Sequence, residues 1–105
     1  MSNVAPLSLL SAVVVLDSTL DHWTLLEPAG GVRRSFVQPI VFERQFAVAP
    51  LVHVGVVGID ASKDHNLRLS VRAEAITEYG FSLRVETWLN TEIWSVEVSW
   101  LAIGS

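Results

Sequence analysis

The sequence predicts an all-β fold, a six-stranded antiparallel β-sandwich. Short segments of alternating apolar and polar residues recur along the chain, turn-forming residues separate them, and no stretch has the period of a helix. Half of the 105 residues are hydrophobic and only 17% are charged, so two sheets can bury ample apolar side chains between them. We expect residues 1–105 to form a single domain, because the chain is too short for two cores.

The N-terminal segment, residues 1–16, is predicted to be an apolar strand or arm, with the strand over residues 10–16. No Lys or Arg precedes its apolar run and Pro6 interrupts it, which is not the composition of a signal peptide. It is also too short to cross a bilayer. We therefore expect no membrane insertion, and the arm should pack on its own domain or on a neighbouring subunit.

Two further strands are predicted over residues 35–42 and 50–59. Pro39 cannot donate a ladder hydrogen bond, which favours an edge strand or a bulge for the first. In the second, alternate valines from Val52 to Val56 form one apolar face, and the opposite face is largely apolar too. The residues of that opposite face are Leu51, His53, Gly55, Val57 and Ile59. Another subunit is the simplest cover for it.

The last three strands are expected over residues 67–76, 81–88 and 95–102. Their predicted inward positions are Leu67, Leu69, Val71, Ala73, Ala75, Phe81, Leu83, Val85, Val96, Val98, Trp100 and Ala102. Between the final two strands, residues 89–92 have the polar, turn-capable character of a hairpin loop. Trp88 therefore lies on the polar face at a strand end, where a large aromatic side chain needs a packing partner or a ligand.

Composition excludes several functions. The formal net charge is −4, which argues against nucleic acid and against a polybasic membrane contact, since both require basic patches. The chain has no cysteine, so it has no disulfide, no thiolate nucleophile and no Cys-ligated zinc. The absence of cysteine fits any compartment and leaves the location undetermined. The apolar excess in so short a chain predicts a homo-oligomer.

Arg68 and Trp88 are the strongest candidate pair for binding a ligand. Each is expected on the polar face near a loop, where an aromatic ring can stack on the C–H patch of a sugar and Arg can donate to hydroxyls. The same two residues also fit a structural cation–π pair, or a Trp that covers a subunit contact. The residue pattern alone leaves these alternatives open.

Six short motifs occur in order along roughly residues 34–104. They are Phe42…Phe46…Pro50-x-Val52, Gly58-Ile59-Asp60, Asn66-Leu67-Arg68, Gly80-Phe81, Thr87-Trp88-x-Asn90-Thr91 and Val98-Ser99-Trp100-Leu101-Ala102. In this order and at these spacings they resemble the H-type lectins, known from snail agglutinins and from the C-terminal domain of discoidins.

The resemblance implies a lectin for multivalent recognition of terminal galactose or N-acetylgalactosamine, without catalysis and without a cofactor, and with a part in cell adhesion. It implies a homotrimer, or a hexamer made of two trimers, with sugar sites at the junctions between subunits. Arg68 and Trp88 would bind the sugar, and Asn66 would shape the loop that presents Arg68. The remaining positions implied are Gly30, Gly31, Arg33, Leu89, Asn90 and Trp94. Core packing is the alternative for Trp94, which shares the parity of Trp100.

Two departures from the family pattern affect the expected site. The snail agglutinins have a His directly after the Trp, where this chain has Leu89, and an Asp in the region that corresponds to Gly31. Loss of an acceptor and a donor predicts a changed ligand or a lost one. The alternative function is therefore a structural trimerisation module without a working sugar site.

Other polar groups favour ordinary structural roles. Residues 60–66 offer several oxygen ligands, but they lack the Glu of an EF-hand, and Asp and Asn commonly satisfy turn backbone. Glu86 and Glu97 are expected to face each other across the hairpin, as surface charges and not as a glycosidase pair. His53 fits an interface position, with a metal at a three-fold axis as the alternative. We predict neither a metal site nor an enzyme.

Overall fold

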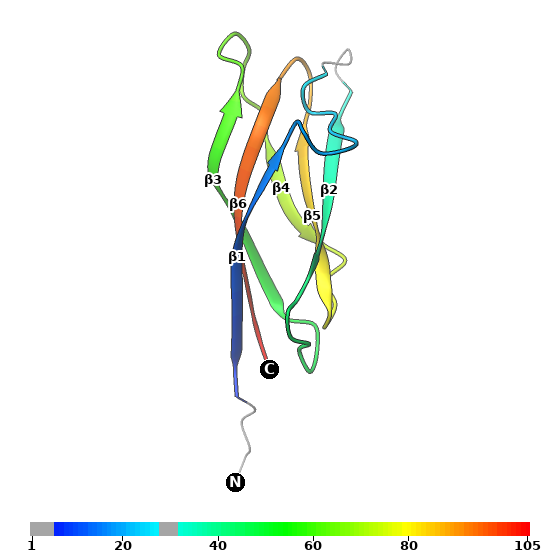
Figure 1. Cartoon of the computed structure of the whole chain (residues 1–105), viewed down its shortest axis with the longest axis vertical. Coiled ribbons are helices and arrows are strands. Elements are labelled where there is room, and N and C mark those ends of the chain that lie inside the picture. The colour runs from blue at the N-terminus through cyan, green and yellow to red at the C-terminus, as the bar shows by residue number, and fades with distance from the viewer. Residues whose placement is uncertain (1–5, 28–31) are drawn as a thin grey trace.

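The computed structural model describes residues 6–27 and 32–105, and within these ranges the chain forms two antiparallel sheets packed face to face with no helix (Figure 1). The strands are β1 (Ser8–Asp17), β2 (Arg34–Val41), β3 (Leu51–Ala61), β4 (Ser70–Glu74), β5 (Gly80–Thr87) and β6 (Ile93–Gly104). The predicted six-stranded β-sandwich is thus confirmed. No helix in the described ranges is long and apolar enough to cross a membrane.

Each sheet contains three strands, in the orders β1-β6-β3 and β2-β5-β4. Consecutive strands therefore mostly alternate between the sheets, and β5 pairs with β2 and β4 but not with β6. The prediction of a β5–β6 hairpin is wrong, because residues 88–92 connect one sheet to the other. A polar turn between two alternating strands fits either connection, since the period of a strand does not identify its partner.

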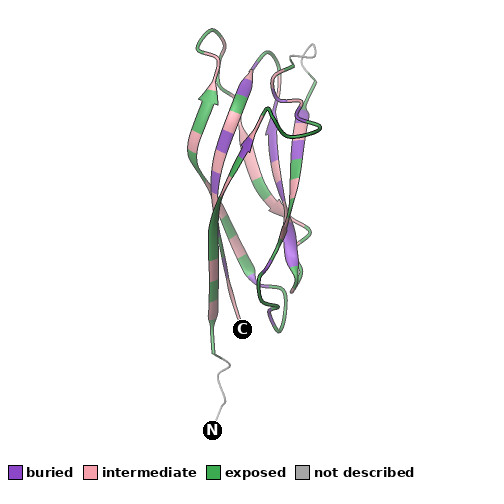
Figure 2. Ribbon diagram, in the orientation of Figure 1, coloured by how far each residue is buried: buried purple, intermediate pink, exposed green. Residues whose placement is uncertain are grey.

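The core lies between the sheets and includes the inward positions of β5 and β6, as predicted (Figure 2). Its members from these two strands are Phe81, Leu83, Val85, Ile93, Val96, Val98, Trp100 and Ala102. The Trp100 ring meets the Phe81 ring edge-on, with 5.5 Å between the centroids. Trp23 is also buried, and its Nε1 atom donates to the Ile93 carbonyl at 3.0 Å.

Pro39 and Gly80 both suit their positions at β2. β2 lies at the edge of its sheet, which confirms the prediction drawn from Pro39, because an edge position spares the ladder the hydrogen bond that proline cannot donate. At the C-terminal end of β2, beside Pro39, Gly80 approaches so closely that a Cβ there would lie 2.1 Å from the Ile40 carbonyl oxygen. Only glycine fits that position without moving the backbone.

The predicted strand over residues 67–76 is shorter in the structure. β4 begins at Ser70, and Leu67, which was expected to point inward, is 55% exposed. Side-chain hydroxyls bind the backbone before β4, since Thr91 donates to the Asn66 carbonyl and Thr87 to the Arg68 carbonyl. These bonds hold the segment as a loop instead of a strand.

The outer face of the β1-β6-β3 sheet is rich in exposed apolar side chains. We call the apolar face the set Leu9, Val13, Val15, Leu51 and Leu101, which alternate with the buried positions of the same sheet. A depression of about 340 Å³ on this face is lined by Val13, His53 and Leu101 among others. A bulge after Val56 shifts the register, so Ile59 lies opposite buried Val96 and not on the outer face, contrary to expectation.

Candidate functional site

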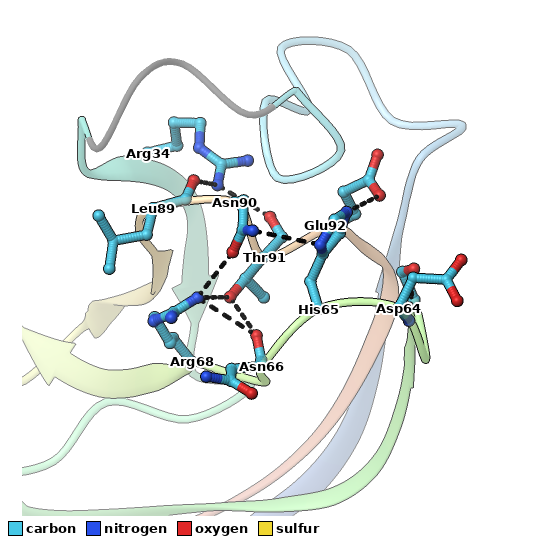
Figure 3. A network of polar contacts seen from close by, with 10 residues as sticks. Arg34, Asp64, His65, Asn66, Arg68, Leu89, Asn90, Thr91 and Glu92 are labelled. Carbon is cyan, nitrogen blue, oxygen red and sulfur yellow. Dashed lines mark hydrogen bonds and ion pairs between the residues drawn. The ribbon is translucent and has the colours of Figure 1, made fainter.

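Three connections meet at one end of the sandwich, at the top of Figure 1. They are the β1–β2 connection (described over residues 18–27 and 32–33), the β3–β4 loop (62–69) and the β5–β6 loop (88–92). The β3–β4 and β5–β6 loops are joined by a hydrogen-bond network that contains Asn66, Arg68 and Asn90, three of the predicted site residues (Figure 3).

Arg34, at the start of β2, anchors the β5–β6 loop. It is only 6% exposed, and its Nη2 atom donates to the carbonyls of Leu89 (2.9 Å) and Thr91 (2.8 Å). Its Nη1 atom donates to the Thr24 carbonyl at 3.3 Å. Burial lowers the pKa of the Arg34 guanidinium, and the charges of Glu92 and Glu27 oppose this shift. Charge-assisted bonds of this kind are strong and fix the loop backbone.

Leu89 adopts a left-handed conformation, with φ of 56°. A branched side chain pays a steric penalty of about 1–2 kcal/mol in this region, so the loop needs outside support to keep this shape. The Arg34 bond to the Leu89 carbonyl provides that support. The Leu89 side chain is exposed, at the position where the sequence predicted a contact with a ligand.

Arg68 links the β3–β4 loop to the β5–β6 loop through one of its nitrogens. Its Nη1 atom donates to Asn90 Oδ1 (3.0 Å), to Thr91 Oγ1 (3.1 Å) and, more weakly, to the Asn66 carbonyl (3.4 Å). Thr91 is buried and donates in turn to the Asn66 carbonyl at 2.6 Å. Within the described residues, the Nη2 and Nε atoms of Arg68 have no hydrogen-bond partner, so this half of the guanidinium can bind a ligand.

His65 and Glu92 extend the network on the other side of Asn90. The Asn90 Nδ2 atom lies 3.2 Å from His65 Nδ1, and His65 Nε2 lies 3.3 Å from Glu92 Oε1. A continuous chain of polar contacts thus runs from Arg68 through Asn90 and His65 to Glu92 (Figure 3).

Trp88 follows β5 directly and is half-buried. The guanidinium carbon of Arg33 lies 4.5 Å from the centroid of the Trp88 ring, and Arg33 Nη1 donates to Glu86 Oε2 at 3.0 Å. The other carboxylate oxygen of Glu86 accepts from Arg72 Nη2 at 2.8 Å. The cation–π partner of Trp88 is therefore Arg33, whereas the alternative weighed from the sequence paired it with Arg68.

Trp94 is not a core residue. The register shifts where β6 begins, so that Ile93 is buried and Trp94 is 41% exposed. Core packing, one of the two alternatives for this residue, is wrong, because the irregular register reverses the parity that a regular strand would give. The Trp94 side chain has no hydrogen bond to the network among the described residues.

Other predicted features fall outside this cluster. Gly30 and Gly31 lie outside the described residues. Glu86 belongs to β5 and Glu97 to β6, which are in different sheets, so the two carboxylates do not face each other as expected. Over residues 6–27 and 32–105, no three His, Asp or Glu side chains gather closely enough to hold a metal ion.

Sequence reasoning missed Arg34, Thr91, His65 and Glu92 as parts of this site. A signal for Arg34 exists, since it shares its strand parity with Phe36, and a charged residue on an inward face must find partners. The others act through loop contacts between distant segments, which leave no local pattern. Chemically, the cluster offers hydrogen-bond donors, an aromatic ring and an exposed apolar side chain, and it lacks an activated nucleophile.

The chain is similar in sequence to a known domain family and to known proteins. The model described as the H-type lectin domain matches residues 37–103. Discoidin-2 of Dictyostelium discoideum is 29% identical over 76 residues, which are 71% of this chain and 30% of that protein. A Fuscovulum blasticum protein described as "ATP synthase subunits region ORF 7" is 37% identical over 76 residues, 72% of this chain and 66% of that protein.

Two solved structures of discoidin II from Dictyostelium discoideum share the fold. The native recombinant protein aligns with a TM-score of 0.78 and 24% identity, over 98% of this chain and 39% of that one. The wild-type protein aligns with a TM-score of 0.79 and 23% identity, over 99% of this chain and 39% of that one. The chain thus spans less than half the length of the discoidins that it matches.

Proposed function

The chain belongs to the H-type lectin domain family, and we propose that it is a lectin-like module that binds carbohydrate at the loop end of the sandwich. The observation that supports this proposal most strongly is the pattern of hydrogen bonds made by the Arg68 guanidinium. Its Nη1 atom is held by Asn90 and Thr91, while its Nη2 and Nε atoms have no partner among the described residues. A donor that is fixed on one side and open on the other is prepared to bind a hydroxyl pair, as sugar recognition requires.

The proposed ligand is a terminal galactose or N-acetylgalactosamine. Arg68 donates to its hydroxyls, and Trp88 stacks on the apolar face of the ring. Leu89 and Asn90, on the loop that Arg34 holds, border the sugar. Arg33 already lies over the Trp88 ring, so a stacked sugar uses the other face of Trp88 or displaces Arg33. Gly30 and Gly31 are proposed to close the site, and Trp94 is retained as a peripheral candidate.

We further propose a homotrimer, or a hexamer of two trimers, with a second copy of the chain as the cover of the apolar face. The exposed side chains of β1, β3 and β6 support this, since a monomer of this size seldom leaves so many apolar residues of one sheet in water. Sites at the junctions of subunits gain avidity when several copies bind one glycan surface. The binding is passive recognition outside the cell and involves no catalysis or cofactor.

A second candidate function is a structural trimerisation module without a working sugar site. Leu89 in place of a His donor and Gly31 in place of an Asp acceptor favour it, since both departures remove polar contacts.

Binding to immobilised glycans separates the two functions, with Arg68→Ala and Trp88→Ala as test variants. A lectin loses sugar binding in both variants while it remains a folded oligomer. A structural module shows no sugar binding to lose.

A further inference from the structure

The orientation of the Asn90 amide is determined by its neighbours. Every polar hydrogen of an Arg guanidinium is a donor and none of its nitrogens accepts. The atom of Asn90 that faces Arg68 Nη1 at 3.0 Å must therefore be the carbonyl oxygen Oδ1. The amide nitrogen Nδ2, which can only donate, consequently points at His65 Nδ1, 3.2 Å away.

This orientation constrains the His65 ring in turn. To accept from Asn90, Nδ1 must carry a lone pair, so the ring is neutral and its one proton resides on Nε2. Nε2 lies 3.3 Å from Glu92 Oε1, an acceptor for that proton. Arg68, Asn90, His65 and Glu92 thus form a chain in which every donor meets an acceptor, and this holds only while the ring is neutral (Figure 3).

We propose that His65 is a positioning residue of the carbohydrate site, which holds Asn90 and through it Arg68 in the binding geometry only while its ring is neutral. Protonation places a hydrogen on Nδ1, which then meets the hydrogens of Asn90 Nδ2. The amide must turn over or move away, and either change removes the acceptor from Arg68 Nη1. The consequence for binding rests on the proposed function, while the coupling of the three side chains does not.

The charges around His65 come from three segments. Glu92, in the β5–β6 loop, faces Nε2 and can hold the ring in either protonation state. Asp64 and Lys63 are neighbours on its own loop and exposed. Arg34, on β2, interacts with the charge of Glu92. Because Glu92 retains a protonated ring in place, acidification changes the orientation of Asn90 without opening the loops.

The direction of the pH effect follows. Imidazole side chains change charge between about pH 5 and 8. With a neutral ring, His65 accepts from Asn90 and the site is ordered; with a protonated ring, Arg68 keeps Thr91 and loses Asn90. Affinity for N-acetylgalactosamine is expected to fall by about tenfold from pH 8 to pH 5, the scale of one hydrogen bond to a charged group.

Nuclear magnetic resonance of the full chain tests the coupling without a ligand. At pH 8 the ring nitrogens of His65 should report the proton on Nε2. As pH falls, the Asn90 side-chain amide and the Arg68 Nε resonances should shift with the same midpoint as His65. A proton on Nδ1 at pH 8, or an Asn90 amide that stays fixed while His65 titrates, would overturn the proposal.

Binding of N-acetylgalactosamine across pH 5–8 tests the consequence. His65→Asn supplies an acceptor that does not titrate, so the affinity of this variant should stay level from pH 8 to pH 5, whatever its value at pH 8. The matched control is His22→Asn, at an exposed turn with φ of 68° that Asn tolerates, and it should keep the acid loss. Sedimentation at each pH measures the oligomeric state, so a change of assembly caused by His53 can be distinguished from a change of sugar affinity caused by His65.

The resonance titration and the binding measurement together distinguish a failure of this inference from a failure of the proposed function. A native affinity that is measurable and level from pH 8 to pH 5 contradicts the positioning role. If the protein binds none of this sugar at any pH, the proposed ligand fails, and the resonance titration alone decides whether His65 controls Asn90 and Arg68.

Discussion

The Nη1 atom of Arg68 donates to the Oδ1 atom of Asn90 over 3.0 Å, and this contact ties the β3–β4 loop to the β5–β6 loop at the end of the sandwich. The same nitrogen is also held by Thr91, while the Nη2 and Nε atoms have no hydrogen-bond partner among the described residues. Loops from both sheets thereby position one donor, and the following predictions test what that donor does.

Replacement of Arg68 by Lys should abolish most sugar binding although the charge is retained. Lys has a single ammonium group and cannot bind Asn90 with one nitrogen while another binds a ligand. We expect an affinity loss of about 1.5–3 kcal/mol, the range for a hydrogen bond to a charged group. Isothermal titration with N-acetylgalactosamine measures it. A Lys variant that binds as well as the native protein would show that Arg68 acts only as a charge.

Replacement of Trp88 by Ala should weaken binding by about 0.5–1.5 kcal/mol more than replacement by Phe, because Phe retains an aromatic face for the sugar to stack on. The two substitutions also weaken the cation–π contact with Arg33 to different degrees. The melting temperature of each variant should therefore be measured beside its affinity, so that a loss of stability is not mistaken for a loss of stacking. Equal affinities for the Ala and Phe variants would exclude stacking as the role of Trp88.

Arg34→Ala should destabilise the fold by about 3 kcal/mol, since it removes a charged donor from three backbone carbonyls, of which that of Thr91 is buried. The free energy of unfolding in urea measures this. Arg44→Ala is the matched control, because Arg44 is exposed and should change stability by less than about 0.5 kcal/mol. Similar values for the two variants would mean that the β5–β6 loop does not depend on Arg34.

Val13→Asp should dissociate the proposed oligomer, because it places a charge on the apolar face. Val41→Asp is the control: this Val is at least as exposed but lies at the end of β2, in the other sheet. Sedimentation equilibrium should give a smaller species for the first variant and the native assembly for the second. Loss of assembly in both variants would place the interface elsewhere.

The ion pair of Glu74 and Arg84 should contribute to stability at neutral pH and not in acid. The hydrogen bond from Arg84 lowers the pKa of the Glu74 carboxyl below its usual value of 4.5. A lowered folded-state pKa stabilises the fold above the unfolded value, and this stability is lost as pH falls through the folded value. The melting temperatures of the native protein and Glu74→Gln should therefore differ at pH 7 and converge as the pH falls below 4.5 and through the lowered folded-state pKa. A difference that persists in acid would contradict this origin.

The sequence was informative wherever burial follows a regular period. The inward positions of β5 and β6, including Phe81 and Trp100, follow from alternation alone, and Pro39 placed β2 at an edge. The core prediction for Trp94 was wrong because an irregular register at the start of β6 reverses which side chains point inward, and no residue pattern marks that shift. The inward position predicted for Leu67 was wrong because hydrogen bonds from Thr87 and Thr91 hold its segment as a loop.

The candidate site could be foreseen in part. The motif around Asn66 and Asn90 identified the two loops that meet at Arg68. The supporting residues were not foreseeable, because Arg34 binds backbone carbonyls of a loop that is distant in sequence. Any residue type offers such a carbonyl, so the contact depends on how the two sheets pack and not on the identity of Leu89 or Thr91.

The most direct test of carbohydrate binding is a glycan array with the labelled native protein beside Arg68→Ala, both verified as folded oligomers of the same size. We predict selective binding of the native protein to terminal galactose or N-acetylgalactosamine, and loss of that binding in the variant. An array that stays blank at high protein concentration, with the native assembly intact, would contradict the lectin function and favour the structural module.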